Sequence, residues 1–107
     1  MRLLPILAAA ALIAACGSAF ASGNAEAGQK KSTACQACHG PNGISVSPAF
    51  PNLAGQNVDF IMEALKQYKD GRRANPIMKG QAANLSERDI EDLAAWFSSQ
   101  HGLQTKH

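Results

Sequence analysis

Several features that define common classes of protein are missing from this sequence. It has no internal repeat, no low-complexity tract and no segment with the pattern of a β-strand. Its main apolar run, residues 3–15, is shorter than the roughly 20 residues that a transmembrane helix needs. Ten basic and eight acidic residues form no long basic stripe, so nothing indicates nucleic-acid binding. These absences favour one small helical domain.

The N-terminus has the layout of a secretory signal peptide. Arg2 precedes the apolar run and small residues follow it, so we expect residues 1–21 to be removed by cleavage after Ala21. The exported chain would be a single domain, residues 22–107, and we expect it in the periplasm. Cys16 leaves an alternative open, because the residues before it resemble a lipoprotein processing box, in which the cysteine is acylated. We favour simple export, with Cys16 discarded.

The chain has only three cysteines, and two of them share one short motif. Cys35 and Cys38 are three positions apart, and His39 follows directly. This pattern is typical of covalent haem attachment, in which each thiol adds to one vinyl group and the histidine ligates the iron. A zinc site would need four ligands, but the other histidines, His101 and His107, lie near the C-terminus, where we expect them to be solvated. A thioredoxin-type pair would follow a strand, and a small disulfide or a pair of buried cysteines is the remaining alternative.

Capping residues and apolar spacing predict three main helices. Residues 24–33 are mostly helix formers, and this helix should run into Cys35, with Gly28 marking a close helix crossing. A second helix is predicted over residues 58–70, between an asparagine cap and a glycine. A capping box at residues 86–89 opens a third helix that should end near residue 100.

Two stretches rich in proline and glycine, residues 40–56 and 72–81, are predicted to be loops. The first is long, and a bound cofactor would give it something to pack on. The second contains Met78, which we favour as the ligand on the other face of the iron because a loop can aim it across the cofactor. Met62 is the weaker candidate, since it lies within a predicted helix where methionine commonly fills the core. An iron held by His39 and Met78 has no open position, which indicates electron transfer and no catalysis.

With these motifs the chain resembles small bacterial monohaem class I cytochromes c. Two more stretches carry the resemblance: Pro-Asn-Leu-Ala-Gly-Gln at residues 51–56 and Leu-Ser-x-x-Asp-Ile at residues 85–90. The resemblance implies an all-α cytochrome c fold, with three main helices and long loops around one covalently bound haem c. It also implies that the first and last helices cross, with Gly28 near Trp96, where a tyrosine is more usual in the family. Some relatives carry two such domains in tandem, whereas this chain has one attachment motif.

The resemblance also assigns residues around the haem. It implies that the Pro51 carbonyl accepts a hydrogen bond from His39, that Leu53 packs on the haem, and that Met78 is the distal ligand. The function implied is that of a one-electron carrier, not an enzyme, with no small-molecule substrate. Its partners would be a membrane cytochrome complex or periplasmic donor and a terminal oxidase or reductase, and we expect a monomer.

Three alternatives remain open at this point. The chain could be the haem subunit of a periplasmic oxidoreductase, or a carrier anchored to lipid through Cys16. If Met78 is not a ligand, the open iron would suit a gas-binding protein or a peroxidase.

Charge is distributed unevenly over the second half of the chain. Residues 87–92 are mainly acidic, whereas five basic residues stand against one acid in the segment before them: Lys66, Lys69, Arg72, Arg73 and Lys79. This asymmetry could steer a charged partner toward the Met78 side of the haem. The alternative is that both are ordinary solvated helix faces.

Overall fold

The computed structural model describes residues 23–101, which form five α-helices. They are α1 (Ala25–Lys31), α2 (Thr33–His39), α3 (Val58–Asp70), α4 (Pro76–Ala82) and α5 (Glu87–Ser98). This described part contains no β-strand, which confirms the predicted all-α architecture, although three main helices had been expected. None of its helices is both long and apolar enough to cross a bilayer. The predicted signal peptide and Cys16 lie outside the described residues.

Both long helices are confirmed almost as predicted. The Asn57 side chain caps α3 by accepting the N–H groups of Asp59 and Phe60, and Gly71 ends the helix with a φ of 86°. Ser86 and Asp89 form a complete capping box at the start of α5. Side chains bind the free backbone N–H groups at both starts, which is why these boundaries were readable from the sequence.

The first predicted helix is interrupted, so the prediction of one continuous helix into Cys35 is wrong. Ser32 separates α1 from α2, and both its hydroxyl and its backbone N–H donate to the Gln29 carbonyl, over 2.7 and 3.2 Å. A serine that bonds to the preceding turn in this way competes with a continuous helical ladder. The interruption lets α2 take its own direction and carry the attachment motif as far as His39.

The prediction of a loop at residues 72–81 is also wrong, because the helix α4 occupies most of this stretch. The Asn75 side chain accepts the Met78 N–H over 3.0 Å, and Pro76 takes the first helical position, where its missing N–H costs nothing. Met78 therefore lies on a short helix and not in a loop.

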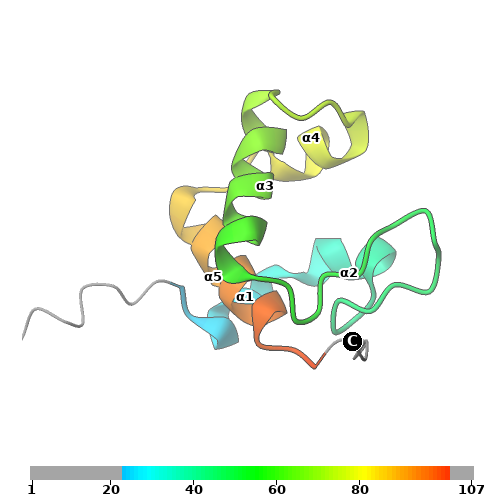
Figure 1. The fold of residues 1–107 in the computed structure, drawn as a ribbon. Helices are drawn as coiled ribbons and strands as arrows, with labels where there is room; N and C mark the ends of the chain where they lie inside the picture. Colours follow the sequence, from blue (N-terminus) through cyan, green and yellow to red (C-terminus); the bar gives the residue numbers. More distant parts are fainter. Residues whose placement is uncertain (1–22, 102–107) are drawn as a thin grey trace, which may run out of the picture.

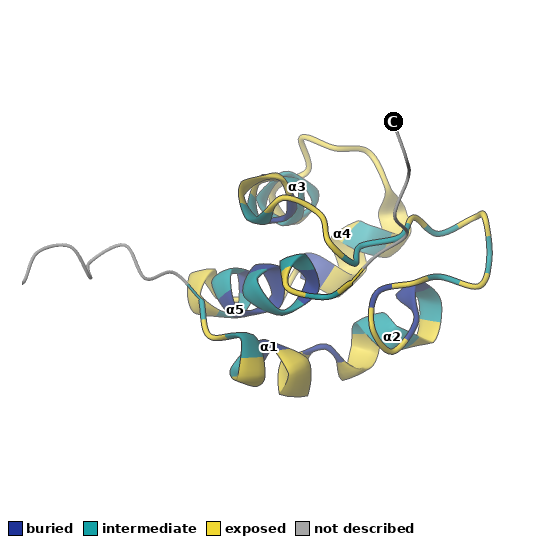
Figure 2. Cartoon of the chain, turned by 60° about the horizontal axis from the view of Figure 1, so that its bottom comes forward, coloured by how far each residue is buried: buried dark blue, intermediate teal, exposed yellow. Residues whose placement is uncertain are grey.

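The helix α5 forms the centre of the molecule and packs against both α1 and α3, while α4 packs on α3 (Figure 1). Figure 2 shows buried residues concentrated along α5. The core cluster consists of one residue of α3 and three of α5: Ile61, Leu93, Ala94 and Phe97. The predicted crossing of the first and last helices is confirmed, since a Cβ added to Gly28 would lie 2.9 Å from the Trp96 Cβ.

The two helices that carry the predicted iron ligands do not pack extensively on one another. The backbone of α2 lies close only to α1 among the described helices, and its Cys35 side chain packs against the core cluster of α3 and α5. Figure 1 shows α2 and α4 on the same side of α3, with α4 near the C-terminal end of α3 and α2 near α1. The fold thus places the candidate ligands on two separate supports that face a common region.

Candidate functional site

The two cysteines of the attachment motif share one face of α2, because residues three apart in a helix are neighbours. Both are half-buried free thiols. Burial, with a smaller contribution from Cys38, raises the pKa of the Cys35 thiol, which keeps its proton at neutral pH. Both thiols are free, and the structure gives no support to a disulfide between the two.

His39 is held in one orientation at the end of α2. Its side chain is 6% exposed, and its Nδ1 lies 2.8 Å from the Pro51 carbonyl oxygen. Since a carbonyl only accepts, Nδ1 carries the proton and Nε2 is left with a lone pair for a metal. The hydrogen bond that the resemblance implied is therefore present. The Phe50 ring meets the imidazole edge-on, with ring centroids 6.1 Å apart.

Two polar residues of the first loop, which the sequence analysis did not single out, fix the Pro51 carbonyl near His39. The Ser45 hydroxyl lies within donating distance of two carbonyl oxygens, that of Ser47 at 2.9 Å and that of Cys38 at 3.3 Å, and its backbone N–H donates to the Asn52 side-chain oxygen over 2.7 Å. Ser45 thus joins the end of α2 to the residue after Pro51. Serine and asparagine commonly bond to nearby backbone in turns, so the only signal in the sequence was their presence in a loop.

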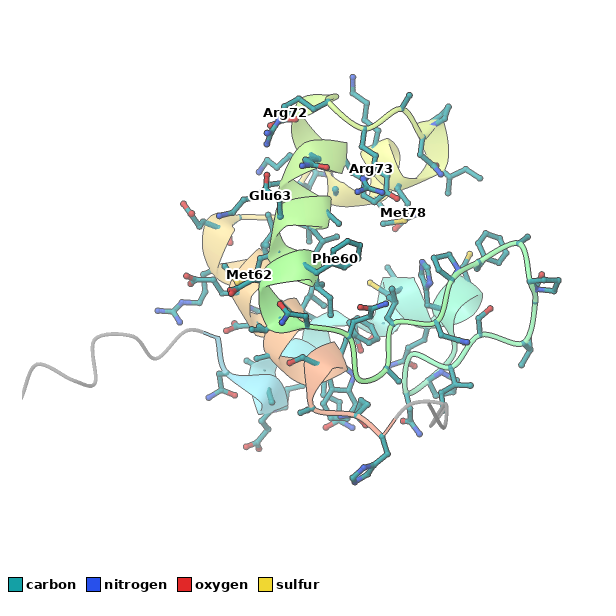
Figure 3. All side chains as sticks on the ribbon, in the orientation of Figure 1. Phe60, Met62, Glu63, Arg72, Arg73 and Met78 are labelled. Carbon is teal, nitrogen blue, oxygen red and sulfur yellow. The ribbon has the colours of Figure 1, made fainter. Side chains whose placement is uncertain are left out.

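Met78 and Met62 have different surroundings. Met78 is half-buried, and Figure 3 shows its side chain on the side of α4 that faces α2. Met62 lies on the side of α3 opposite to Phe60 and packs against the core cluster. Leu53, expected on the haem, also packs against this cluster. The arrangement favours Met78 over Met62 as a ligand.

Phe60 is an apolar side chain left open to solvent. It is 52% exposed and points from α3 toward the region that α2 and Met78 face (Figure 3). A large exposed ring of this kind commonly marks a surface that binds an apolar partner or ligand. A flat apolar group lying between α2 and α4 would cover it.

The donor set fits a haem better than a simple metal ion. Within residues 23–101, no three His, Cys, Asp or Glu side chains lie close enough to hold a metal together, which argues against the zinc alternative. His101 is exposed, as expected, and His107 lies outside the described range. What the site offers is two thiols, an oriented imidazole, a thioether and an apolar ring, the groups that a covalently attached haem requires.

The comparisons with known proteins agree on one family. A protein-family model described as cytochrome c matches residues 25–101. Cytochrome c-554(548) of Halomonas halodenitrificans is 42% identical over 82 residues, which cover 74% of this chain and 99% of that protein. Cytochrome c4 of Pseudomonas aeruginosa is 46% identical over 84 residues, which cover 78% of this chain but only 42% of that protein.

A solved structure is similar as well. The crystal structure of reduced recombinant cytochrome c4 from Pseudomonas stutzeri matches with a TM-score of 0.73 and 43% identity. The match covers 77% of this chain and 48% of that one. The chain therefore spans about half the length of the cytochrome c4 relatives that it matches, and nearly all of the Halomonas protein.

Proposed function

This chain belongs to the cytochrome c family, and from that premise we propose that it is a periplasmic one-electron carrier with a single haem c. The observation that carries the proposal is the pair of candidate ligands on separate helices. A buried imidazole on α2 has its Nε2 left free by the Pro51 carbonyl, and a thioether on α4 faces the same region. One attachment motif in the chain supports one haem.

In this proposal each residue of the site has a distinct role. Cys35 and Cys38 would hold the haem through thioether bonds, and His39 Nε2 would be a ligand of its iron. The Pro51 carbonyl fixes the tautomer of His39 and strengthens it as a donor. Met78 would be the second protein ligand of the iron. When bound, haem c supplies an iron that alternates between the ferrous and ferric states.

The choice of ligands supports a carrier over an enzyme. A thioether is a soft, neutral donor that favours ferrous iron, so Met78 would raise the reduction potential relative to a second imidazole. With protein ligands on both sides, no position stays open for a substrate. Leu53 and Phe60 would exclude water from the apolar faces of the cofactor, which also favours the less charged, reduced state.

The proposed partners are redox proteins. We expect the donor to be a membrane cytochrome complex or a periplasmic protein, the acceptor to be a terminal oxidase or reductase, and the carrier to be a monomer. A lipid anchor through Cys16, or a place as haem subunit of a periplasmic oxidoreductase, would keep the same chemistry. A gas-binding or peroxidase function would require a vacant coordination position on the iron, which means that Met78 would not be a ligand.

The test compares the absorption spectrum of the air-oxidised wild-type protein with that of its Met78→Ala variant. We expect a weak near-infrared band, from charge transfer between methionine sulfur and ferric iron, that disappears in Met78→Ala. The matched control is Met62→Leu, which should keep the band because Met62 packs in the core. If the wild-type protein lacks the band and binds carbon monoxide readily once reduced, Met78 is not the ligand and the carrier proposal fails.

A further inference from the structure

One backbone rotation decides where the Pro51 carbonyl points. The ring of a proline fixes φ near about −65°, so the rotation ψ of Pro51 is the freedom that remains. The same rotation moves Asn52, the residue joined directly to that carbonyl. A contact that holds Asn52 in place therefore also helps to hold the carbonyl oxygen 2.8 Å from His39 Nδ1.

The side chain of Asn52 anchors it to the opposite part of the loop. Its Oδ1 accepts the backbone N–H of Ser45 over 2.7 Å, across seven positions of the chain. Both residues are half-buried, and a hydrogen bond that is partly shielded from water is stronger than an exposed one. Asn52 is thus fixed by a specific bond and not by its place in the chain alone.

The turn that begins at Ser45 also supports the residue before Pro51. The Ser47 carbonyl accepts the Phe50 N–H over 3.1 Å, and the Ser45 hydroxyl lies 2.9 Å from the same carbonyl oxygen. That hydroxyl also lies 3.3 Å from the carbonyl of Cys38, near the end of α2. The turn therefore ties both flanks of Pro51 to the helix that carries the imidazole.

A second support of the loop acts further along the chain. The Gly43 carbonyl accepts the N–H groups of Leu53 and Ala54, over 2.7 and 3.1 Å. Both bonds act beyond Asn52, whereas the bond to Ser45 acts on Asn52 itself. The two supports can be distinguished, because removal of the Asn52 side chain leaves the bonds to Gly43 in place.

We propose that Asn52 is a positioning residue for His39, and that it acts through the Pro51 carbonyl on the donor strength of Nε2. The inference rests on the proposed function, because it concerns His39 as an iron ligand. A firm hydrogen bond from Nδ1 places more negative charge on the imidazole and makes Nε2 a stronger donor. A stronger donor stabilises ferric iron relative to ferrous iron, so the anchor at Asn52 should lower the reduction potential.

The first measurement is hydrogen exchange at His39 Nδ1–H in the ¹⁵N-labelled, reduced holoprotein. In Asn52→Ala we expect exchange to become about fivefold to tenfold faster, the factor expected for the loss of one hydrogen bond. Asn52→Asp keeps an acceptor oxygen for the Ser45 N–H and should bring the rate back to within about twofold of the wild type. This rescue is judged by exchange, because the added charge would itself change the potential.

The matched control is Asn57→Ala. The Asn57 Oδ1 also accepts backbone N–H groups, over 2.8 and 3.1 Å, but it caps α3 and takes no part in the contacts around Pro51. Asn57→Ala should therefore lower the free energy of unfolding and change the exchange rate of His39 Nδ1–H by less than about twofold. It separates a general loss of stability from an effect on the imidazole.

The second measurement is the midpoint potential of the same variants. At the wild-type midpoint, Asn52→Ala should raise the ratio of reduced to oxidised protein about twofold to fivefold. This is an upward shift of about 20–40 mV, since a tenfold change corresponds to about 59 mV for one electron. Asn57→Ala should leave the potential unchanged. The near-infrared band should persist in both variants, because Met78 lies on α4.

Two outcomes would overturn the proposal. One is that Asn52→Ala matches Asn57→Ala in exchange and in potential, which would show that the Gly43 carbonyl is enough to hold the loop. The other is that exchange stays fast in Asn52→Asp, which would show that the acceptor oxygen is not the group that matters. If the wild-type protein has the near-infrared band in either case, only this inference fails, and the proposed function stands.

Ser45→Ala keeps the proposal testable if Asn52→Ala does not accumulate as a holoprotein. This change preserves the backbone N–H that Asn52 accepts but removes the hydroxyl that links the turn to the carbonyls of Cys38 and Ser47. We expect faster exchange at His39 Nδ1–H, by a smaller factor than in Asn52→Ala. An exchange rate equal to that of the wild type would count against the proposal.

Discussion

At the scale of single residues, Gly28 decides how closely α1 can approach α5. A Cβ at this position would lie 1.9 Å from the Asp92 carbonyl oxygen and 2.9 Å from the Trp96 Cβ, both far inside contact distance. The first of these atoms belongs to the backbone of α5, which cannot turn aside as a flexible side chain could. An added methyl group can therefore fit only if the two helices move apart.

We expect Gly28→Ala to lower the free energy of unfolding of the holoprotein by about 1–3 kcal/mol, the usual cost of overpacking. Guanidinium denaturation would measure it. Gly80→Ala is the matched control, because no atom lies within 4 Å of a Cβ added to Gly80 in α4. There alanine should be neutral or stabilising, by up to about 1 kcal/mol. Equal stability of Gly28→Ala and the wild type would show that the crossing is loose.

Asp92 is a second residue on which the same crossing depends. It is 2% exposed, and its carboxylate accepts the Asn24 N–H over 2.8 Å and the Lys31 ammonium over 2.6 Å. The Asn24 N–H, and after it Lys31, hold the pKa of Asp92 below its ordinary value of 3.8. The Ser86 N–H, together with Lys31, lowers the pKa of Asp89 to about 2. Both carboxylates thus stabilise the fold in their charged form.

A lowered pKa gives stability that is fully present above the unfolded value and is lost as the pH falls through the folded one. We therefore expect the free energy of unfolding to decrease between about pH 4 and pH 2. Asp92→Asn should be less stable at pH 7 and show a shallower decrease in this range. Glu91→Gln is the control on the same helix, and it should lower the free energy of unfolding at pH 7 less than Asp92→Asn, because the Glu91 carboxylate lies 4.0 Å from Arg88, beyond hydrogen-bond distance. An unchanged profile in Asp92→Asn would contradict this assignment.

At the scale of whole elements, the sequence predicted the helices that begin with a strong cap and continue long enough to show periodicity. Those are α3 and α5. The prediction from the sequence failed at two places. At Ser32 a local hydrogen bond interrupts a run of good helix formers. The helix α4 has seven residues, which is too short to show a helical period. The Asn75-Pro76 pair was a helix-start signal for α4, but the nearby glycines and proline outweighed it in the prediction.

The position of Met78 depends on the cap of α4, because the helix is short and the side chain of Asn75 binds the Met78 N–H. We expect Asn75→Ala to destabilise α4 by about 1 kcal/mol, which makes local opening about fivefold more frequent. Added imidazole should then displace Met78 from ferric iron about fivefold more readily, as followed by loss of the near-infrared band. Asn24→Ala removes the equivalent cap of α1, a helix without a ligand, and should leave imidazole affinity unchanged.

At the scale of the whole molecule, the site was predictable to the extent that it is local in the sequence. Cys35, Cys38 and His39 lie within one short motif, so the sequence alone predicts haem attachment there. The contact of His39 with the Pro51 carbonyl joins residues twelve positions apart and required the resemblance to a known family. The pairing of Lys66 with Glu87 depends on how α3 packs against α5. No pattern in the sequence predicts how these two helices pack.

The chain alone has a small core for its size. Only six apolar side chains are buried in the described part: Ile61, Ala82, Ile90, Leu93, Ala94 and Phe97. Phe60 stays half exposed, and among the described residues α2 contributes only Cys35 to the packing around the core cluster. In a domain of fewer than 100 residues, so few buried apolar groups contribute only a small free energy of folding. The haem would therefore have to supply a large part of the apolar interior.

We expect the double change Cys35→Ala with Cys38→Ala, which prevents covalent attachment, to leave a chain without a cooperative thermal transition. Its helical circular dichroism should fall well below that of the holoprotein, and its ¹⁵N spectrum should lose the dispersion of a folded protein. Alanine suits helix α2, so the change itself adds no local strain. If the haem-free double variant instead melts cooperatively with wild-type helix content, then α1, α3 and α5 form a sufficient core, and the haem serves electron transfer without being needed for folding.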